Sequence, residues 1–301
     1  MSATSSQLDI AKVLAQLAER VERALDRWLA PAGSPPELAE AMRYAVLGGG
    51  KRLRPALVFL AAQACGNGQE RTADPAPAAA AIEMVHCYSL VHDDLPAMDD
   101  DVLRRGQATV HVKFGEAMAI LVGDALLTQA FAVLAEQVAD PALCGRLTAE
   151  LARGAGAAGM IAGQVADMNL CRVAEGQAGL EYIHRRKTAD MFAAAARMGG
   201  LCAGAGEPHL AALGQFAMDL GLAFQVRDDL LDATASSDQL GKTAGKDVAA
   251  GKLTYVALLG PERAAAAATE LSRRAIGRLD VFGPAAEPLR LLAAMLMERK
   301  H

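Results

Sequence analysis

The sequence predicts an all-α protein in which about ten helices form nearly the whole fold. Turn-forming segments recur along the chain, and the segments between them are long and rich in Ala, Leu, Met and Glu. Runs of alternating β-branched residues are nearly absent, so essentially no sheet is expected. No shift in composition marks a boundary within the 301 residues, and we therefore expect a single domain over residues 1–301.

The turn-forming segments separate the expected helices. They lie at residues 31–36, 66–77, 139–141, 204–208 and 282–284. Asp74-Pro75 and Asp140-Pro141 each resemble an N-cap followed by a first-turn proline, which predicts that helices begin at these two points. Residues 152–164 (ARGAGAAGMIAGQ) are expected to be helical as well, with small residues that let helix axes approach closely.

Composition narrows the possible functions. A net charge of −5 and a pI near 5.7 give no reason to expect a nucleic-acid partner. The five cysteines are scattered without a C-x-x-C pair, which favours reduced thiols in a cytoplasm, and the N-terminal MSATSSQLDIAKVL lacks a signal-peptide pattern. The most apolar window, residues 117–135, contains Asp124 and Gln129, so we expect a buried helix there and no membrane span.

Two acidic clusters interrupt apolar sequence. In the first, HDDLPAMDDD (92–101), Pro96 cannot donate to the carbonyl of His92 and should loosen or end the helix, which lets Asp99 curl back toward Asp93 and Asp94. His92 itself is expected to hold a hydrogen bond near the cluster and not a metal. A single acidic cluster is usually a solvated helix end, but the flank MVHCYSLV (84–91) has the composition of a buried segment.

The second cluster is RDDLLD (227–232). Asp228 and Asp232 stand four residues apart and share one helix face with Gln225, and the flank GLAFQV (221–226) is apolar. Both clusters therefore predict carboxylates at the mouth of a cavity. Oxygen ligands without accompanying Cys or His suit Mg²⁺, which usually binds one or two carboxylates together with substrate phosphates.

Basic runs support a phosphorylated substrate. They are GGGKRLRP (48–55), LRRG (103–106) and RRKT (185–188). Each run alone would more often be ordinary surface, but Arg forks and Lys charges are the usual partners of phosphate oxygens. Three such runs among apolar helices, together with two aspartate clusters, predict a site for phosphate and metal.

As a set, these residues resemble the trans-prenyl diphosphate synthases, and among them the bacterial farnesyl diphosphate synthases, over nearly the whole chain. The matching segments are GGGKRLRP, EMVHCYSLVHDDLPAMDDDVLRRG, GQVAD (163–167), Lys187-Thr188, FQVRDDLLD (224–232) and LGKTAGKDVAAGKLTY (240–255). The resemblance implies the isoprenoid synthase fold, with helices around a deep central cavity. It also implies a homodimer.

The resemblance assigns a role to each matching residue. It implies about three Mg²⁺ ions at Asp93, Asp94, Asp99, Asp228 and Asp232, with Asp229 in the second catalytic motif. Contacts to an allylic diphosphate, or to the cation it leaves, are implied for Arg104, Lys187, Thr188, Gln225, Lys242 and Lys252. Binding of isopentenyl diphosphate is implied for Lys51, Arg54, His86 and Arg105. Gln164 and Asp167 match a polar pair near the metals.

The implied reaction condenses isopentenyl diphosphate with dimethylallyl and then geranyl diphosphate. Tyr88, with its neighbour Ser89, is expected to set the length of the product, because an aromatic ring five residues before Asp93 lies roughly 7.5 Å down the helix. The family's pattern then favours the farnesyl product over the geranyl or geranylgeranyl product. The Gly- and Lys-rich residues 234–252 are expected to close over the diphosphates through Lys242 and Lys252.

Other interpretations explain less of the sequence. GAGAAG (154–159) fits G-x-G-x-x-G, but no strand precedes it, and GGGKR lacks the first glycine of a P-loop. Two E-x-x-H pairs, which begin at Glu83 and Glu181, are half the pattern of a di-iron bundle but leave both aspartate clusters without a role. A terpene cyclase usually mixes Asn, Ser or Thr with Glu in its second motif, and a silent partner subunit needs no intact site.

Overall fold

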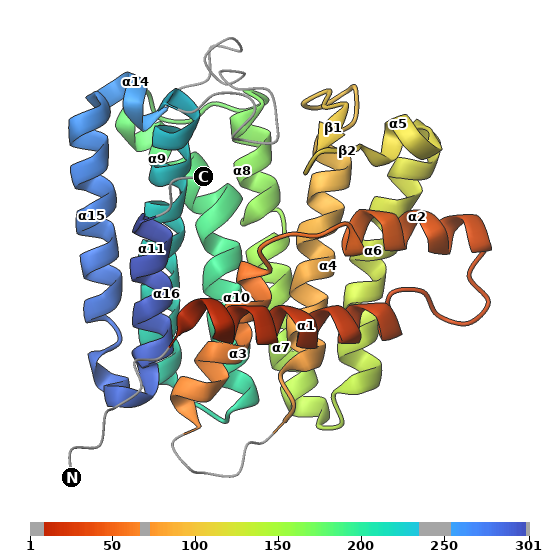
Figure 1. The fold of residues 1–301 in the computed structure, drawn as a ribbon, viewed down its shortest axis with the longest axis horizontal. Helices are drawn as coiled ribbons and strands as arrows, with labels where there is room; N and C mark the ends of the chain where they lie inside the picture. The colour runs from red at the N-terminus through yellow and green to blue at the C-terminus, as the bar shows by residue number, and fades with distance from the viewer. Residues whose placement is uncertain (1–8, 67–72, 235–253, 299–301) are drawn as a thin grey trace.

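A computed structural model describes residues 9–66, 73–234 and 254–298, and it confirms the all-α prediction (Figure 1). Within these residues there are twelve α-helices of eight residues or more, slightly above the expected ten. The helices are α1 (Ile10–Trp28), α2 (Pro36–Leu47), α3 (Leu53–Cys65), α4 (Ala76–Asp93), α5 (Val110–Phe114), α6 (Glu116–Gln137), α7 (Pro141–Ala155), α8 (Met160–Asp167), α9 (Gln177–His184), the π-helix η1 (Arg185–Ala189), α10 (Asp190–Cys202), α11 (Glu207–Thr234), α14 (Tyr255–Leu259), α15 (Pro261–Gly277), the 3₁₀-helix η2 (Asp280–Ala286) and α16 (Glu287–Glu298). The expectation of one domain over 1–301 stays a prediction.

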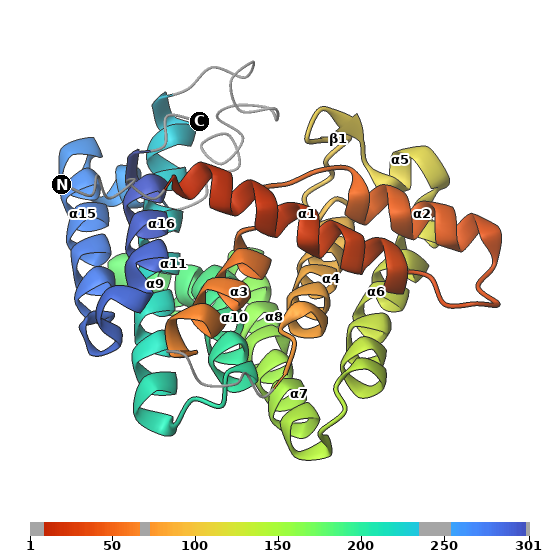
Figure 2. The same ribbon diagram turned by 60° about the horizontal axis from the view of Figure 1, so that its bottom comes forward.

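The interior of the bundle is formed by helices that are apolar on most of their surface. Most side chains of α3, α4 and α10 are buried, which is typical of helices enclosed by other helices. α10 packs against both α3 and α11, and α4 packs against α6. Figures 1 and 2 show α1 and α2 running across the direction of α4, α6 and α11. The buried helix α4 thus delivers its C-terminal aspartates to one end of the bundle.

Both predicted helix starts are confirmed. Asp140 caps α7, and its carboxylate accepts a hydrogen bond of 2.9 Å from the backbone N–H of Ala142. The Asp74 carboxylate accepts one of 3.1 Å from the N–H of Ala76, so α4 begins just after the Asp-Pro pair. This hydrogen bond holds the N-terminus of α4, the helix that ends at the first aspartate cluster.

A short hairpin departs from the expectation of essentially no sheet. β1 (Leu103–Arg104) pairs antiparallel with β2 (Gln107–Ala108), with Leu103 opposite Ala108. The chain turns at Arg105 and Gly106, which both have positive φ, at 55° and 75°. The hairpin was not predicted because two-residue strands leave no alternating pattern. Figure 1 shows the hairpin above one end of α4, and β1 carries Arg104.

The prediction of a continuous helix over 152–164 is wrong. α7 ends at Ala155 and α8 starts at Met160, because Gly156 and Gly159 take backbone angles outside the helical region. The expected close packing is nevertheless present on either side of this break. A Cβ on Gly154 would lie 2.7 Å from the Cβ of Ala194 on α10, and a Cβ on Gly163 would lie 2.1 Å from the backbone nitrogen of Lys187.

Helix α6 is less buried than expected. By length and composition it is apolar enough to cross a membrane, with a mean hydropathy of 1.9, and 39% of that window is buried. It packs against α4 and α2 on one side, yet Ile120 and Leu121 on another side are 46% and 56% exposed. Within the described residues, no neighbouring element covers these side chains, so the prediction of a buried helix is wrong for this face. The absence of a membrane span stays a prediction.

We expect Gly199→Ala to destabilise the protein, because a Cβ on Gly199 of α10 would lie 2.1 Å from the carbonyl oxygen of Val58 on α3. Backbone atoms must move apart to admit the methyl group, at a cost of roughly 1–3 kcal/mol. Gly145 on α7 is the matched control, since nothing lies within 4 Å of its added Cβ. Gly145→Ala should stabilise by roughly 0.5–1 kcal/mol. Urea unfolding measures both, and equal midpoints would contradict the close approach of α3 and α10.

Candidate functional site

The first aspartate cluster turns back on itself, as Pro96 predicts. α4 ends at Asp93, and the backbone N–H of Asp99 donates to the carbonyl of Asp93 at 2.8 Å. The N–H of Asp101 donates to the carbonyl of Asp94 at 3.2 Å. The turn brings the Asp99 carboxylate close enough to Asp93 to help raise the pKa of Asp93.

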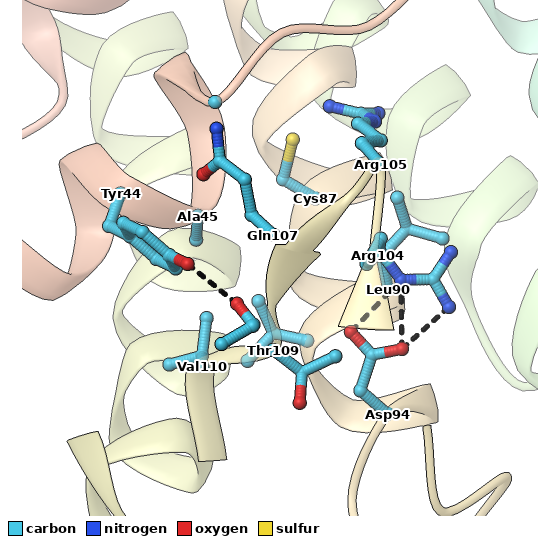
Figure 3. A pocket seen from close by; sticks show the side chains of 13 residues that line it. Tyr44, Ala45, Cys87, Leu90, Asp94, Arg104, Arg105, Gln107, Thr109 and Val110 are labelled. Atoms are coloured by element: carbon cyan, nitrogen blue, oxygen red, sulfur yellow. Dashed lines mark hydrogen bonds and ion pairs between the residues drawn. The ribbon is translucent and has the colours of Figure 1, made fainter. Parts of the chain in front are cut away.

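Asp94 is held by Arg104 of the hairpin (Figure 3). Nε of Arg104 donates to both carboxylate oxygens of Asp94, at 2.8 and 2.9 Å, and an Nη donates to one of them at 2.6 Å. Such forked contacts are among the stronger side-chain interactions. Asp94 was expected to be a metal ligand, but in this structure both of its oxygens already accept hydrogen bonds from Arg104 and its side chain is buried.

Asp93 faces α8. Nε2 of Gln164 donates to its carboxylate at 2.8 Å, while the Gln164 carbonyl oxygen is buried and, within the described residues, accepts no hydrogen bond. Burial raises the pKa of Asp93 to about 6, Lys187 opposes that rise and Asp99 adds to it. A partly buried carboxylate with a raised pKa and an adjacent unpaired acceptor is a favourable environment for a cation.

The opposite side of the site is formed by η1 and α11. Lys187 donates to the carboxylate of Asp167 at 2.7 Å, and the Thr188 hydroxyl donates to the side-chain oxygen of Gln225 at 3.0 Å. The π-helical turn η1 carries both Lys187 and Thr188, and such turns are frequent at functional sites. α11 continues from Gln225 through Asp228 and Asp232, so the helical stripe that the sequence predicted is present.

Asp229 lies in a buried network that sequence reasoning missed. Its carboxylate accepts a 2.9 Å hydrogen bond from the backbone N–H of Tyr255 and lies 3.9 Å from Nε2 of His184. The rings of His184 and Tyr255 stack with centroids 5.6 Å apart, and the Tyr255 hydroxyl donates to Glu181 at 3.3 Å. The only sequence signal was the Glu181-x-x-His184 spacing, which suggested a different site. Glu181 and His184 instead hold the start of α14 against α9, and Asp229 ties it to α11.

The residues expected to bind isopentenyl diphosphate surround the loop before α3. Arg105 donates to the carbonyl of Gly49, and Gly50, at φ 135°, leaves room for its guanidinium, which would lie 2.8 Å from an added Cβ. Arg54 packs over the ring of Phe192 at 5.2 Å. Burial, followed by the charges of Arg54 and Arg105, holds the pKa of His86 well below its usual range. His86 is therefore neutral beside a concentration of positive charge.

A small pocket adjoins this region. It lies between α2, α4 and the hairpin, contains about 430 Å³ of space that is partly open to solvent, and has Arg104, Arg105 and Cys87 in its wall. Figure 3 shows the Tyr44 hydroxyl on its far side, which donates to the carbonyl of Ala108 at 2.6 Å. This bond ties the end of the hairpin to α2 and so helps to fix the two arginines.

Tyr88 is buried on α4, one turn before His92. The two rings meet edge to face with centroids 5.9 Å apart, and Nε2 of His92 lies 3.1 Å from the carbonyl of Ile120, to which it donates. This hydrogen bond confirms the expected role of His92. The His92 ring lies against Gly123, because a Cβ added to Gly123 would come within 2.0 Å of Nε2 of His92. Within the described residues the buried Tyr88 hydroxyl has no partner, and Ser89 donates back to the carbonyl of His86.

The donor set fits Mg²⁺ better than iron. Within residues 9–66, 73–234 and 254–298, no group of three or more His, Cys, Asp or Glu side chains is arranged to hold a metal. Mg²⁺ needs only one or two carboxylates when substrate phosphates and water complete its shell. Glu83 and Glu181, the carboxylates of the di-iron interpretation, bond to Arg52 and Tyr255 instead. Lys242, Lys252 and the expected closing segment lie outside the described residues.

Comparison with known proteins gives a consistent result. The family model described as polyprenyl synthetase matches residues 35–280. The farnesyl diphosphate synthase of Geobacillus stearothermophilus is 42% identical over 309 residues, which cover 98% of this chain and 100% of that protein. The chloroplastic heterodimeric geranylgeranyl pyrophosphate synthase large subunit 1 of Arabidopsis thaliana is 43% identical over 304 residues, which cover 98% of this chain and 81% of that protein.

Solved structures share the fold. A geranyltransferase from Helicobacter pylori, complexed with magnesium and isoprenyl diphosphate, is similar with a TM-score of 0.84 and 33% identity, covering 99% of this chain and 100% of that one. A geranyltransferase from Legionella pneumophila gives a TM-score of 0.84 at 32% identity, covering 96% and 97% of the two chains.

Proposed function

Because the chain belongs to the polyprenyl synthetase family, we propose that it is a farnesyl diphosphate synthase, which condenses isopentenyl diphosphate with dimethylallyl and then geranyl diphosphate. A prenyl diphosphate synthase is the general conclusion that the family supports. The observation that carries the proposal for this chain is the position of η1: Lys187 lies close enough to Asp93 to oppose the rise of its pKa, and the adjacent Thr188 bonds to Gln225 on α11, the helix of the second aspartate cluster.

The proposed chemistry begins with loss of diphosphate from the allylic substrate. Mg²⁺ held by Asp93, Asp99, Asp228 and Asp232 would stabilise the negative charge that develops on that group. Lys187 and Arg104 supply fixed positive charge beside the same carboxylates, and Asp167 and Asp94 hold them in place. We propose this positioning role for Asp94 in preference to direct metal binding, since both of its oxygens are bound by Arg104.

The allylic cation must meet the double bond of isopentenyl diphosphate before water reaches it. The hydroxyl oxygen of Thr188 and the side-chain oxygen of Gln225, 3.0 Å apart, present dipoles to a cation without forming a covalent bond. Lys51, Arg54, His86 and Arg105 would bind the second diphosphate, with His86 on the same side of α4 as Asp93. A neutral His86 can donate one hydrogen bond to that group while the arginines supply the charge.

The farnesyl product has one alternative, a geranylgeranyl product. Relatives of similar identity include a geranylgeranyl pyrophosphate synthase large subunit as well as a farnesyl diphosphate synthase. The buried Tyr88 ring packs against His92, whose own ring lies against Gly123, and it favours the shorter product because it gives the growing tail a rigid stop. A geranylgeranyl product is the second candidate, since its relatives match this chain as closely.

We expect the purified protein to convert labelled isopentenyl diphosphate and an allylic primer to a prenyl diphosphate only when Mg²⁺ is present. EDTA should abolish the activity and added Mg²⁺ should restore it. Asp93→Ala and Asp228→Ala should each lower the rate of product formation by several orders of magnitude, since removal of one stabilising group alone costs ~10²–10³ in rate. Chromatography of the products measures rate and chain length together. Full activity in EDTA, or no product from any primer, would contradict the proposed function.

Tyr88→Ala should yield products of twenty carbons or more with unchanged dependence on Mg²⁺, because it opens volume below the site without altering a charge. Tyr88→Phe is the matched control, because it keeps the ring and removes only a hydroxyl that has no partner among the described residues. It should make the wild-type product. Product length is read by mass spectrometry. A folded Tyr88→Ala variant with the wild-type product would show that Tyr88 is not the stop.

The assembly we propose is a homodimer in which a second copy covers the exposed face of α5 and α6. Val112, Ile120 and Leu121 on this face are each 46–56% exposed, although α6 is apolar along its length. Light scattering should give about twice the 31.3 kDa chain mass. Leu121→Glu should yield a monomer, whereas Leu170→Glu, at a 70% exposed site after α8, should not. A wild-type monomer would contradict this assembly.

The cysteines bear on the proposed cytoplasmic location. None of the five forms a disulfide in the structure, and Cys87 and Cys202 are buried. Burial raises the pKa of each of these two thiols to about 12, which keeps them protonated and unreactive. A chain whose five cysteines form no disulfide is suited to a reducing compartment.

A further inference from the structure

We propose that the buried ion pair between Arg52 and Glu83 is a positioning pair that aligns the two segments expected to bind isopentenyl diphosphate. This proposal rests on the proposed function. Neither residue matches the substrate-binding positions of the sequence analysis, and Glu83 stood out there only as part of an E-x-x-H spacing.

The pair is almost completely removed from solvent. An Nη of Arg52 donates to Oε1 of Glu83 at 2.8 Å, and the two side chains are 1% and 2% exposed. The other Nη donates to the carbonyl of Val46, in the last turn of α2, at 2.6 Å. It also lies 3.5 Å from a carboxylate oxygen of Glu22 on α1. One guanidinium therefore ties α1, α2 and α4 to the start of α3.

The backbone at Arg52 shows what this attachment controls. Arg52 has φ 48° and ψ 37°, a left-handed conformation that is unfavourable for a residue with a Cβ. It turns the chain from the glycine loop into α3, between Lys51 and Arg54. Such a conformation persists only where the surroundings fix it, and here the fixed group is the Arg52 side chain. The directions of Lys51 and Arg54 therefore depend on the contacts of Arg52.

Glu83 anchors the other end of the ion pair on α4. It lies one turn before His86 on the same helix face, so it ties the loop that carries Lys51 to the helix that carries His86. On its other side the loop is held by Arg105, which donates to the carbonyl of Gly49. The expected isopentenyl diphosphate residues thus lie between two arginine attachments, of which only Arg105 belongs to the expected binding set.

The negative charge of Glu83 also compensates the positive charge that gathers around His86. Arg52 and Arg54 lie close enough to His86 that both depress its pKa, and Glu83 is the leading opposite charge acting on each arginine. Loss of the Glu83 charge would leave several positive groups in partly buried surroundings without compensation. We expect Arg54 and the loop to move apart in response, which would spoil the fit to a diphosphate.

The test is Glu83→Gln, which keeps the shape and a hydrogen-bond acceptor for Arg52 but removes the charge. KM for isopentenyl diphosphate should rise about tenfold or more, since small displacements of binding groups have effects of this order. KM for the allylic substrate, the Mg²⁺ dependence and the product length should not change. Glu150→Gln is the matched control, because Glu150 accepts two hydrogen bonds from Arg197, at 2.9 and 3.0 Å, in a pair between α7 and α10. It should leave both KM values unchanged.

A merely structural role would lower the melting temperature and the fraction of active enzyme without selecting one substrate. An unchanged KM for isopentenyl diphosphate, or equal rises for both substrates, would therefore overturn the proposal. If Glu83→Gln does not fold, Arg52→Lys decides, because one ammonium cannot reproduce the fork that joins Glu83 to Val46. It should show the same selective rise, and its absence would also overturn the proposal. A wild-type protein that makes no product would instead refute the function on which the pair depends.

Discussion

The carboxylates at the end of α4 repel one another and lose hydration where they are buried, and much of the surrounding structure offsets these two effects. Arg104 holds Asp94 with forked hydrogen bonds, and Gln164 donates to Asp93. Even so, the pKa of Asp93 stays near 6. A carboxylate whose pKa is raised chiefly by burial gains from a nearby cation, as expected of a site that binds cations together with their substrate.

α4 connects this charge to the other requirements of the proposed reaction. Glu83, His86 and Asp93 share one side of the helix, spaced by three and seven residues, and Tyr88 faces His92 on another. The residues proposed to bind metal, to bind the second diphosphate and to stop chain growth therefore all include members of one buried helix, α4. Its first turn is held by the hydrogen bond from the N–H of Ala76 to Asp74, and its sides are packed against α3 and α6. A shift of this helix would move every part of the site together.

Sequence patterns predicted those parts of the site that are local. The turn after Pro96 follows from the missing proline N–H, and the stripe from Gln225 to Asp232 follows from helical periodicity. The contacts that orient these groups join residues distant in sequence, such as Arg52 with Glu83, Asp229 with Tyr255 and His92 with Gly123. No periodicity encodes such pairs. The break between α7 and α8 was missed for a related reason, because Ala- and Gly-rich sequence is compatible with both a helix and a turn.

The two E-x-x-H pairs show how a local motif can be correct in geometry and wrong in chemistry. Each pair does place a carboxylate and a histidine on one helix face, as a di-iron site requires. At Glu83 the carboxylate is bound to a permanently charged guanidinium, and at Glu181 it accepts from a tyrosine hydroxyl. His184 is buried and its pKa is lowered to about 4 by desolvation, so it stays neutral and stacks on Tyr255. A carboxylate already bonded to a buried cation gains little from a metal. The partner that each side chain meets across the bundle therefore decides whether such a spacing binds iron or aligns a diphosphate site.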